Sequence, residues 1–173
     1  QYVSEVKTWR LGDPLSKESD MGPLARLDLR AQLDSQVQRS IEMGAKCILG
    51  GSYDSDETGF FYSPTVLTET NAKMPVINEE TFGPVASIQS FSSDQEAVYL
   101  ANQSCYGLGA SLWGKDRAHL QQVAQEVEAG NICINQMVSS DPAYPFGGVK
   151  SSGFGRELGR EGVIAFSNIK VVR

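Results

Sequence analysis

Two neighbouring acids and an aromatic ring are the first residues of this sequence that could hold a ligand. Glu79 and Glu80 are followed by Phe82 and by the turn Gly83-Pro84. A carboxylate can accept hydrogen bonds from both vicinal hydroxyls of a ribose, and an aromatic ring can pack against a flat heterocycle, so a nicotinamide riboside would fit. The alternative is structural: the acids form the solvated start of a helix, and Phe82 packs in the core.

Glycine is concentrated in residues 145–159, here called the glycine-rich segment, with five glycines in the thirteen residues from Gly147. Each glycine loses much conformational entropy on folding, so this density indicates a close approach of backbones. Neither GxxxxGK[ST] nor a strand-linked GxGxxG is matched, which argues against a phosphate loop. We expect Lys150 and Arg156 to tie down this backbone, with a surface salt bridge as the alternative for Arg156.

The three cysteines predict no metal site. Cys47, Cys105 and Cys133 form no CxxC pair, and His119 is the single histidine, so the spacing of a zinc site is missing. We interpret all three as free, inert thiols in a reducing compartment. A thiol hydrolase that uses Cys105 with His119 is an alternative, although no third orienting group or oxyanion-hole glycine pattern accompanies the pair.

The composition is that of one globular domain, with 173 residues, 40% of them hydrophobic and 21% charged. The net charge of -6 and the scattered basic residues argue against a nucleic-acid partner. No apolar run is long enough to span a bilayer, and no signal peptide is recognisable. We therefore expect a cytoplasmic protein that does not bind membranes and whose partner is a small molecule or another protein.

Alternating strands and helices predict an α/β fold with a parallel open sheet flanked by helices. A long amphipathic helix is expected over 24–45, where Leu29, Leu33, Val37 and Ile41 recur every fourth position. Further elements are predicted as a helix end at 1–9, strands at 47–49, 65–67, 85–91, 108–113 and 132–134, and helices that begin after the caps Ser93 and Asp116, the second ending at Gly130. The ligand crevice of such a sheet lies at the carboxyl ends of its strands.

Two motifs make the sequence more specific. Residues 79–84 resemble the E-E-x-F-G-P cofactor signature of aldehyde dehydrogenases, and residues 145–157 resemble the P-F-G-G-x-K-x-S-G-x-G-R-E stretch of that family. Segments 106–110 and 11–14 are also similar to sequences that the family carries there. The chain is thus identified as similar to a C-terminal catalytic-domain segment of the aldehyde dehydrogenase superfamily. Segments 21–26, 29–30 and 140–141 are most like bacterial succinate-semialdehyde dehydrogenases.

The resemblance implies a lobe of the catalytic domain over residues 1–167 and the start of an oligomerisation strand over 168–173, in a homodimer or homotetramer that uses NAD or NADP. In the family, a cysteine thiolate attacks the aldehyde, and a glutamate activates the water that hydrolyses the resulting thioester. No residue of this chain matches either of these two groups. The nucleophile and the cofactor-binding domain are therefore expected upstream, and the isolated chain is expected to be inactive.

Carried over by position, the resemblance assigns Glu80 to the nicotinamide ribose, and Phe82 and Leu108 to the surroundings of the nicotinamide. Phe146 would line the aldehyde tunnel. The loop 136–144 would shape substrate choice, with Ser140 as a donor to a substrate carboxylate. The alternatives are a core role for Leu108 and a plain turn role for Ser140.

Asp141 complicates the assignment of a carboxylate substrate, because its charge would repel that substrate unless it turns outward or pairs with a cation. Two other functions stay open. The chain could be a truncated, non-catalytic association module of the same fold, or part of a generic aldehyde dehydrogenase with another substrate.

Overall fold

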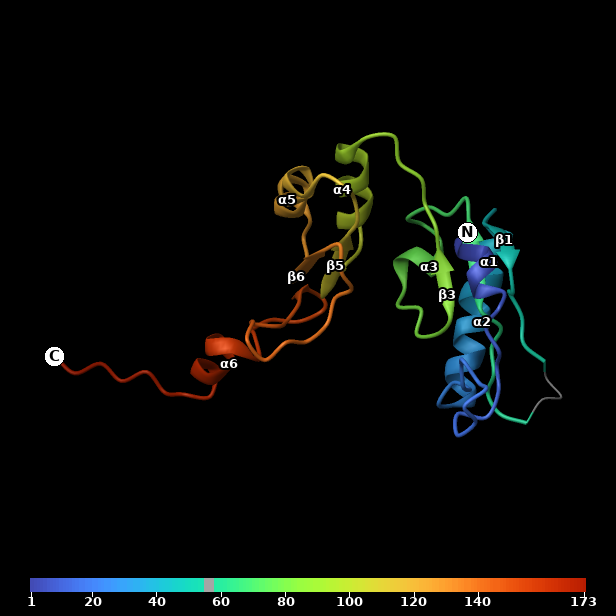
Figure 1. Ribbon diagram of the computed structural model, residues 1–173, viewed down its shortest axis with the longest axis horizontal. Helices are drawn as coiled ribbons and strands as arrows, with labels where there is room; N and C mark the ends of the chain where they lie inside the picture. The colour runs from blue at the N-terminus through green and yellow to red at the C-terminus, as the bar shows by residue number, and fades with distance from the viewer. Residues whose placement is uncertain (55–57) are drawn as a thin grey trace. The chain divides into compact units, whose positions relative to one another are not determined.

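The computed structural model describes residues 1–54 and 58–173. The chain divides into two compact units, unit 1 (Gln1–Ser90) and unit 2 (Phe91–Arg173). Each unit has helices and strands of its own (Figure 1). No helix within the described residues is both long and apolar enough to cross a membrane.

Unit 1 is built from a three-stranded sheet and the long helix predicted from the sequence. Its elements are α1 (Tyr2–Val6), α2 (Leu27–Glu42), β1 (Lys46–Leu49), β2 (Thr65–Thr68), α3 (Pro75–Asn78) and β3 (Val85–Ser87). The strand order is β1-β2-β3, with β1 antiparallel and β3 parallel to β2. The predicted helix and the first two strands are confirmed, whereas α3 was not anticipated.

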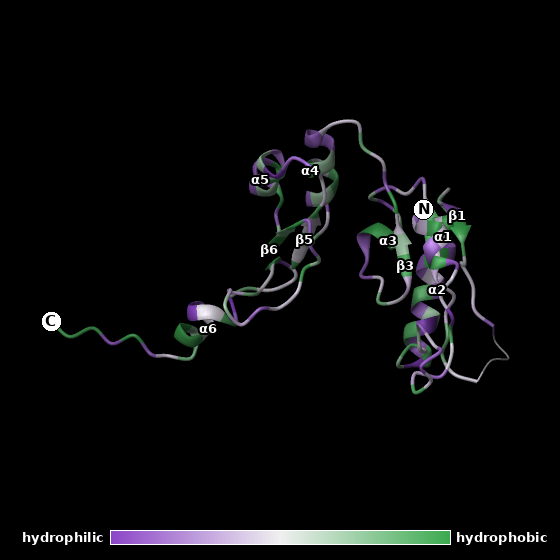
Figure 2. Cartoon of the chain, in the orientation of Figure 1, coloured by the Kyte–Doolittle hydropathy of each residue, from purple (hydrophilic) through white to green (hydrophobic). Residues whose placement is uncertain are grey.

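Helix α2 supplies the centre of the core of unit 1. Leu33 and Val37 are 1% and 0% exposed and pack in one cluster with Tyr62, Leu67 and Met74. Hydrophilic and hydrophobic residues alternate along α2 (Figure 2), as its amphipathic pattern predicts. The core places α2 against the segment after α3, which carries the acids of the E-E-x-F-G-P motif.

Unit 2 contains the α/β layer that the alternation of elements predicts. Its elements are α4 (Asp94–Asn102), β4 (Tyr106–Gly107), β5 (Gly109–Leu112), α5 (Arg117–Glu126), β6 (Asn131–Ile134), β7 (Val149–Lys150) and α6 (Gly159–Ala165). Strands β5 and β6 are parallel and are joined through α5, whereas β4 and β7 are antiparallel. The α/β class is confirmed. The strands do not form one continuous parallel sheet, because β3 pairs with β2 within unit 1 and the strands of unit 2 pair separately, β4 with β7 and β5 with β6.

The helix caps agree with the sequence in part. The Ser93 side chain accepts a hydrogen bond from the backbone N–H of Glu96 at 3.2 Å, and Asp116 caps α5 through the N–H of His119. In a capping box, which the Ser93–Glu96 spacing fits, Glu96 would also accept from the backbone N–H of Ser93. Its carboxylate instead accepts from the backbone N–H and the hydroxyl of Ser92 at 2.8 and 2.6 Å. These hydrogen bonds lower the pKa of Glu96.

The prediction that Gly130 ends α5 is wrong. The helix stops at Glu126, and Val127 is its C-cap with extended backbone angles. Gly130 has a different role, because it lies where two backbones meet next to the glycine-rich segment.

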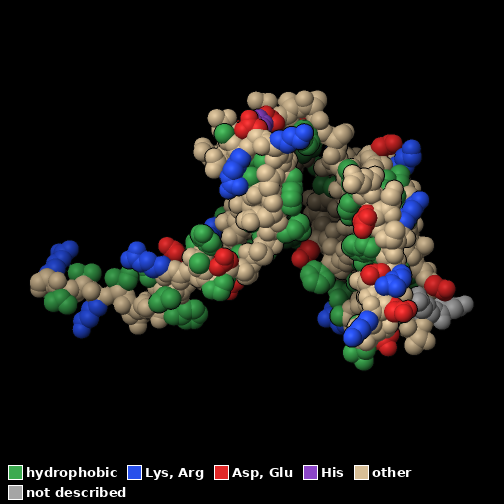
Figure 3. Space-filling view, viewed as in Figure 1, with side chains coloured by type: hydrophobic (Ala, Val, Ile, Leu, Met, Phe, Trp, Pro, Cys, Tyr) green, Lys and Arg blue, Asp and Glu red, His purple; other side chains and the backbone are tan. Residues whose placement is uncertain are grey.

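The last residues of the chain form no strand in this structure. Phe166, Ile169 and Val171 are 95%, 87% and 75% exposed, and the segment shows hydrophobic and basic side chains to solvent (Figure 3). A strand needs a partner for its backbone hydrogen bonds. The oligomerisation strand over 168–173 therefore stays a prediction that concerns a second subunit.

Replacement of the buried Leu33 should destabilise the protein far more than replacement of an exposed leucine on the same helix. We expect Leu33→Ala to lower the free energy of unfolding by about 2–5 kcal/mol, because it removes buried methyl groups and leaves a cavity. Leu27→Ala is the control, since Leu27 is 56% exposed on α2. Urea denaturation of both variants checks this, and equal losses would contradict the assignment of the core.

Candidate functional site

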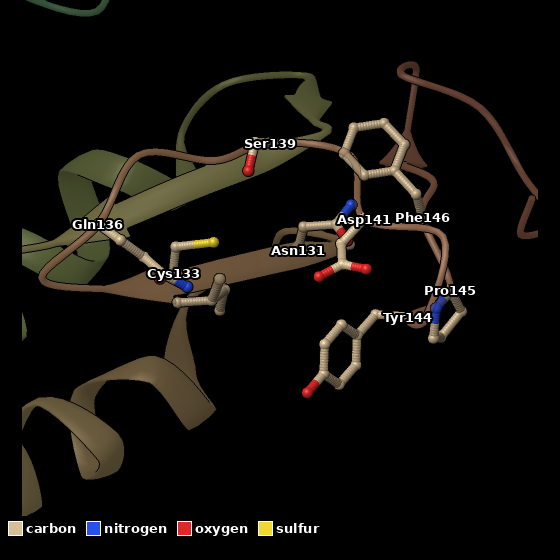
Figure 4. Close-up of a pocket in the computed structure, with 10 residues that line it drawn as sticks. Asn131, Cys133, Gln136, Ser139, Asp141, Tyr144, Pro145 and Phe146 are labelled. Atoms are coloured by element: carbon tan, nitrogen blue, oxygen red, sulfur yellow. The ribbon is translucent and has the colours of Figure 1, made fainter. Parts of the chain in front are cut away.

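A cleft of about 460 Å³ lies in unit 2 beside β6 and the loop that follows it. Figure 4 shows side chains from the strand and from the loop around this space. The lining residues are Gly130, Asn131, Ile132, Cys133, Gln136, Ser139, Asp141, Tyr144, Pro145 and Phe146. The sequence predicted the loop side of the cleft, but not the side formed by β6.

Phe146 is fixed in this cleft by the glycine-rich segment. Its backbone N–H donates to the Glu157 carbonyl at 2.7 Å, and its carbonyl accepts from the Glu157 N–H at 2.8 Å. The Arg156 guanidinium donates to the carbonyls of Gly148 and Gly155 at 2.9 and 2.6 Å. The prediction that Arg156 ties down this backbone is confirmed. Arg156 forms no salt bridge with any acid in the described part of the chain.

The side chain of Lys150 does not bond the glycine-rich segment as predicted. Its ammonium donates to the carbonyls of Asn102 and Ser104 at 2.8 and 3.1 Å and pairs with Glu128 at 2.7 Å. These contacts fasten β7 to the end of α4. Lys150 therefore satisfies carbonyls at a helix C-terminus, and Arg156 alone of the two bonds the glycine-rich backbone.

The strand side of the cleft depends on a close approach of two backbones. A Cβ atom built on Gly130 would collide with the carbonyl oxygen of Gly147 and would lie 2.8 Å from its carbonyl carbon. The N–H of Gly130 donates to the carbonyl of Gly107 at 3.0 Å, so the strand cannot easily retreat. Gly130 is therefore required by packing against the glycine-rich segment.

The two loop serines differ in their relation to the cleft. Ser139 lines the cleft, whereas Ser140 is exposed and is not among the lining residues. The role given to Ser140 stays a prediction, and Ser139 is its competitor.

Asp141 lines the cleft, and no cation is paired with it in the described part of the chain. Its carboxylate accepts a hydrogen bond from the N–H of Ala143 at 2.9 Å. It has thus neither turned away from the cleft nor paired with a base.

The two acids predicted to be near a cofactor lie in unit 1 and differ in their contacts. Glu79 accepts from the Gln36 amide at 3.1 Å and pairs with Arg39 at 3.2 Å. The carboxylate of Glu80 is exposed, and Gln36 contacts only its backbone carbonyl. Because Glu79 is engaged with α2, Glu80 is the acid that is available to a ligand.

The structural alternatives for the nearby aromatic and for Leu108 are not supported. Phe82 is 69% exposed and follows α3, which ends at Asn78, so the acids do not begin a helix and the ring is not in the core. Leu108, at the break between β4 and β5 in unit 2, is 46% exposed. Both side chains are therefore accessible for contact with a ligand.

The thiols form no catalytic dyad. All three cysteines are free, as predicted, and the His119 ring lies 3.1 Å from Asp94. No hydrogen bond joins Cys105 to His119 among the described residues, where no metal-binding cluster of His, Cys, Asp or Glu is found either. Cys133 lies on the wall of the cleft, which its position in a strand did not reveal.

The family model for the aldehyde dehydrogenase family matches residues 1–172. The chain belongs to the aldehyde dehydrogenase family. It is 44% identical over 163 residues to the probable succinate-semialdehyde dehydrogenase [NADP(+)] of Synechocystis, covering 94% of this chain and 36% of that relative. It is 40% identical over 172 residues to the succinate semialdehyde dehydrogenase [NAD(P)+] of Escherichia coli K12, covering 99% and 37%.

Solved structures of aldehyde dehydrogenases share the fold. The betaine aldehyde dehydrogenase of Staphylococcus aureus in complex with NAD+ superposes with a TM-score of 0.90 at 35% identity, covering 95% of this chain and 33% of that one. The structure of Gox0499 superposes with a TM-score of 0.93 at 39% identity, covering 99% and 37%. The chain thus spans little more than a third of the length of its relatives, and the predicted family and fold class are confirmed.

A methyl group at Gly130 should disturb this aldehyde dehydrogenase segment at the cleft. We expect Gly130→Ala to lower stability by about 1–3 kcal/mol or more, because a backbone carbonyl cannot move as a flexible side chain can. Gly114→Ala is the control, since its Cβ would only touch Leu120 at 3.4 Å. Thermal denaturation of the two full-length variants checks this, and a neutral Gly130→Ala would show that the backbones can separate.

Proposed function

We propose that this chain is part of an NAD(P)-dependent aldehyde dehydrogenase that oxidises succinate semialdehyde to the carboxylic acid. The observation that carries the proposal is the similarity, at 44% and 40% identity, to relatives named succinate-semialdehyde dehydrogenase. The reaction needs a cysteine thiolate and a water-activating glutamate, and this chain contributes neither. We expect the 173 residues alone to oxidise no aldehyde.

The contribution of unit 1 is to hold the cofactor. When bound, a nicotinamide cofactor would supply the hydride acceptor that oxidation of an aldehyde requires. The exposed, unpaired carboxylate of Glu80 fits the ribose hydroxyls, and the exposed ring of Phe82 fits the flank of a flat heterocycle. Leu108, which the family resemblance also assigns to the nicotinamide, is an exposed apolar side chain of unit 2.

The contribution of unit 2 is to hold the aldehyde. Phe146 provides an apolar wall, and the loop 136–144 provides donors for the far end of the substrate. Its hydroxyls can donate to a carboxylate, and Asp141 opposes that interaction. The balance of these groups decides how strongly a carboxylate-bearing aldehyde is preferred.

Loss of the Glu80 charge should slow hydride transfer and weaken cofactor binding. In the full-length enzyme, we expect Glu80→Gln to weaken the binding free energy of the cofactor by about 1.5–3 kcal/mol, because it removes hydrogen bonds to a charged group. Single-turnover NAD(P)H formation and cofactor titration measure the two effects. Glu79→Gln is the matched control, because it breaks a half-exposed pair with Arg39 that is worth about 0–1 kcal/mol.

The two acids give opposite expectations, so the outcome is decisive. Glu80→Gln should leave the melting temperature unchanged, and Glu79→Gln should leave the cofactor affinity unchanged. Unaltered cofactor affinity and single-turnover rate in Glu80→Gln would return Glu80 to the role of a solvated surface acid.

Loss of a loop hydroxyl should affect a carboxylate-bearing aldehyde selectively. We expect Ser140→Ala to lower kcat/KM for succinate semialdehyde by a factor that corresponds to about 1–2 kcal/mol of transition-state stabilisation. The kcat/KM for butanal should hardly change, because only succinate semialdehyde uses the hydrogen bond. Ser139→Ala is tested beside it, since Ser139 lines the cleft and Ser140 does not. A selective loss in Ser139→Ala alone would move the donor role to Ser139.

Other results of the same assay would change the proposal. Equal losses for both aldehydes, or a wild-type preference for butanal or for a cationic aldehyde, would leave an aldehyde dehydrogenase of different substrate choice. Absence of NAD(P)H formation with any aldehyde would leave a non-catalytic association module of the same fold.

A further inference from the structure

Asn131, the first residue of β6, makes hydrogen bonds that the sequence did not suggest. Asparagine is uncommon in strands because its side chain competes with the backbone for hydrogen bonds. An asparagine at the start of β6 therefore suggests a specific role for its side chain. Its side-chain amide nitrogen donates to the carbonyl of Gly147 at 2.9 Å and to the carbonyl of Leu108 at 3.2 Å. Both hydrogens of one NH₂ group are thus used on two separate segments.

The first of these segments carries Phe146. Gly147 follows Phe146 directly, and the backbone of Phe146 is itself held by the paired hydrogen bonds with Glu157. The hydrogen bond from Asn131 fixes the carbonyl of Gly147. The position of Phe146 beside the cleft therefore depends on both sets of hydrogen bonds, one of them made by Asn131.

The second segment carries Leu108. Its carbonyl accepts from the backbone N–H of Asn131 at 3.1 Å as well as from the side chain. Leu108 sits in the single-residue gap between β4 and β5, where the regular ladder is interrupted. Asn131 thus bonds the backbone at the residue whose side chain is assigned to the cofactor.

We propose that Asn131 is a positioning residue that sets the separation between the aldehyde-side segment at Phe146 and the nicotinamide-side segment at Leu108. The inference rests on the proposed function, because it matters for hydride transfer between two ligands. An aspartate has the same shape but no donor, alanine has neither, and glutamine carries the NH₂ group one methylene farther out. Only asparagine fits both carbonyls without moving the strand.

The expected consequence is a slower hydride step with little loss of folding. Hydride transfer needs reacting atoms within about 3–3.5 Å, and a displacement of about 1 Å can cost 100-fold in rate. We expect Asn131→Ala and Asn131→Asp in the full-length enzyme to reduce the single-turnover rate of NAD(P)H formation about tenfold or more. The isotope effect on kcat/KM with a C1-deuterated aldehyde should rise, because hydride transfer becomes more rate-limiting.

A matched control separates positioning from stability. Asn102 also makes two side-chain hydrogen bonds, to the carbonyl of Glu126 and from the N–H of Glu128, each at 2.8 Å. Asn102→Ala removes the same number of hydrogen bonds, here between α4 and the C-terminal end of α5, and Asn102 does not line the cleft. We expect it to lower the melting temperature but to leave the isotope effect at the wild-type value.

The outcomes are distinct. A wild-type enzyme that forms no NAD(P)H from any aldehyde contradicts the proposed function itself. An active wild type together with Asn131 variants whose isotope effect and rate match those of Asn102→Ala overturns only the positioning role. Should Asn131→Ala fail to fold, Asn131→Gln, which retains the donors, is expected to fold and to show an intermediate rate; a wild-type rate in that variant would also overturn the role.

Discussion

The cleft of unit 2 depends on one constraint, the contact between the backbone of Gly147 and the start of β6. Gly130 has no Cβ, so the Gly147 carbonyl can come within reach of the Asn131 amide at 2.9 Å. Arg156 then bonds the next carbonyl, at Gly148. A side chain at Gly130 would push these groups apart, and the wall that carries Phe146 would move with them.

In unit 1 the two neighbouring acids differ, because Glu79 is bonded to α2 and the side chain of Glu80 is exposed. Helix α2 binds Glu79 through Gln36 and Arg39, and Gln36 is itself 2% exposed within the core. The Glu80 carboxylate and the Phe82 ring, which come next in the chain, are exposed.

The sequence predicted the parts of this structure that depend on local pattern. The spacing of Leu33 and Val37 predicted α2, and the N-cap chemistry at Ser93 and Asp116 predicted two helix starts. It failed where the deciding partner is distant in sequence: Gly130 looked like a helix end because its contact with Gly147 is seventeen residues away along the chain. For the same reason Asn131 was missed, and the choice between Ser139 and Ser140 depends on how the loop turns.

The charge of the cleft limits how substrate preference can arise. Asp141 is the single charged residue among the described residues that line it. Two like charges about 4 Å apart repel by about 1 kcal/mol in water but by about 4 kcal/mol at the lower effective dielectric near a protein surface. A hydrogen bond from a loop hydroxyl to a carboxylate contributes about 1.5–3 kcal/mol, so it outweighs Asp141 only while the cleft stays hydrated. A closed site that prefers succinate semialdehyde therefore needs a cation from another part of the enzyme, placed close enough to Asp141 or to the substrate to neutralise the repulsion.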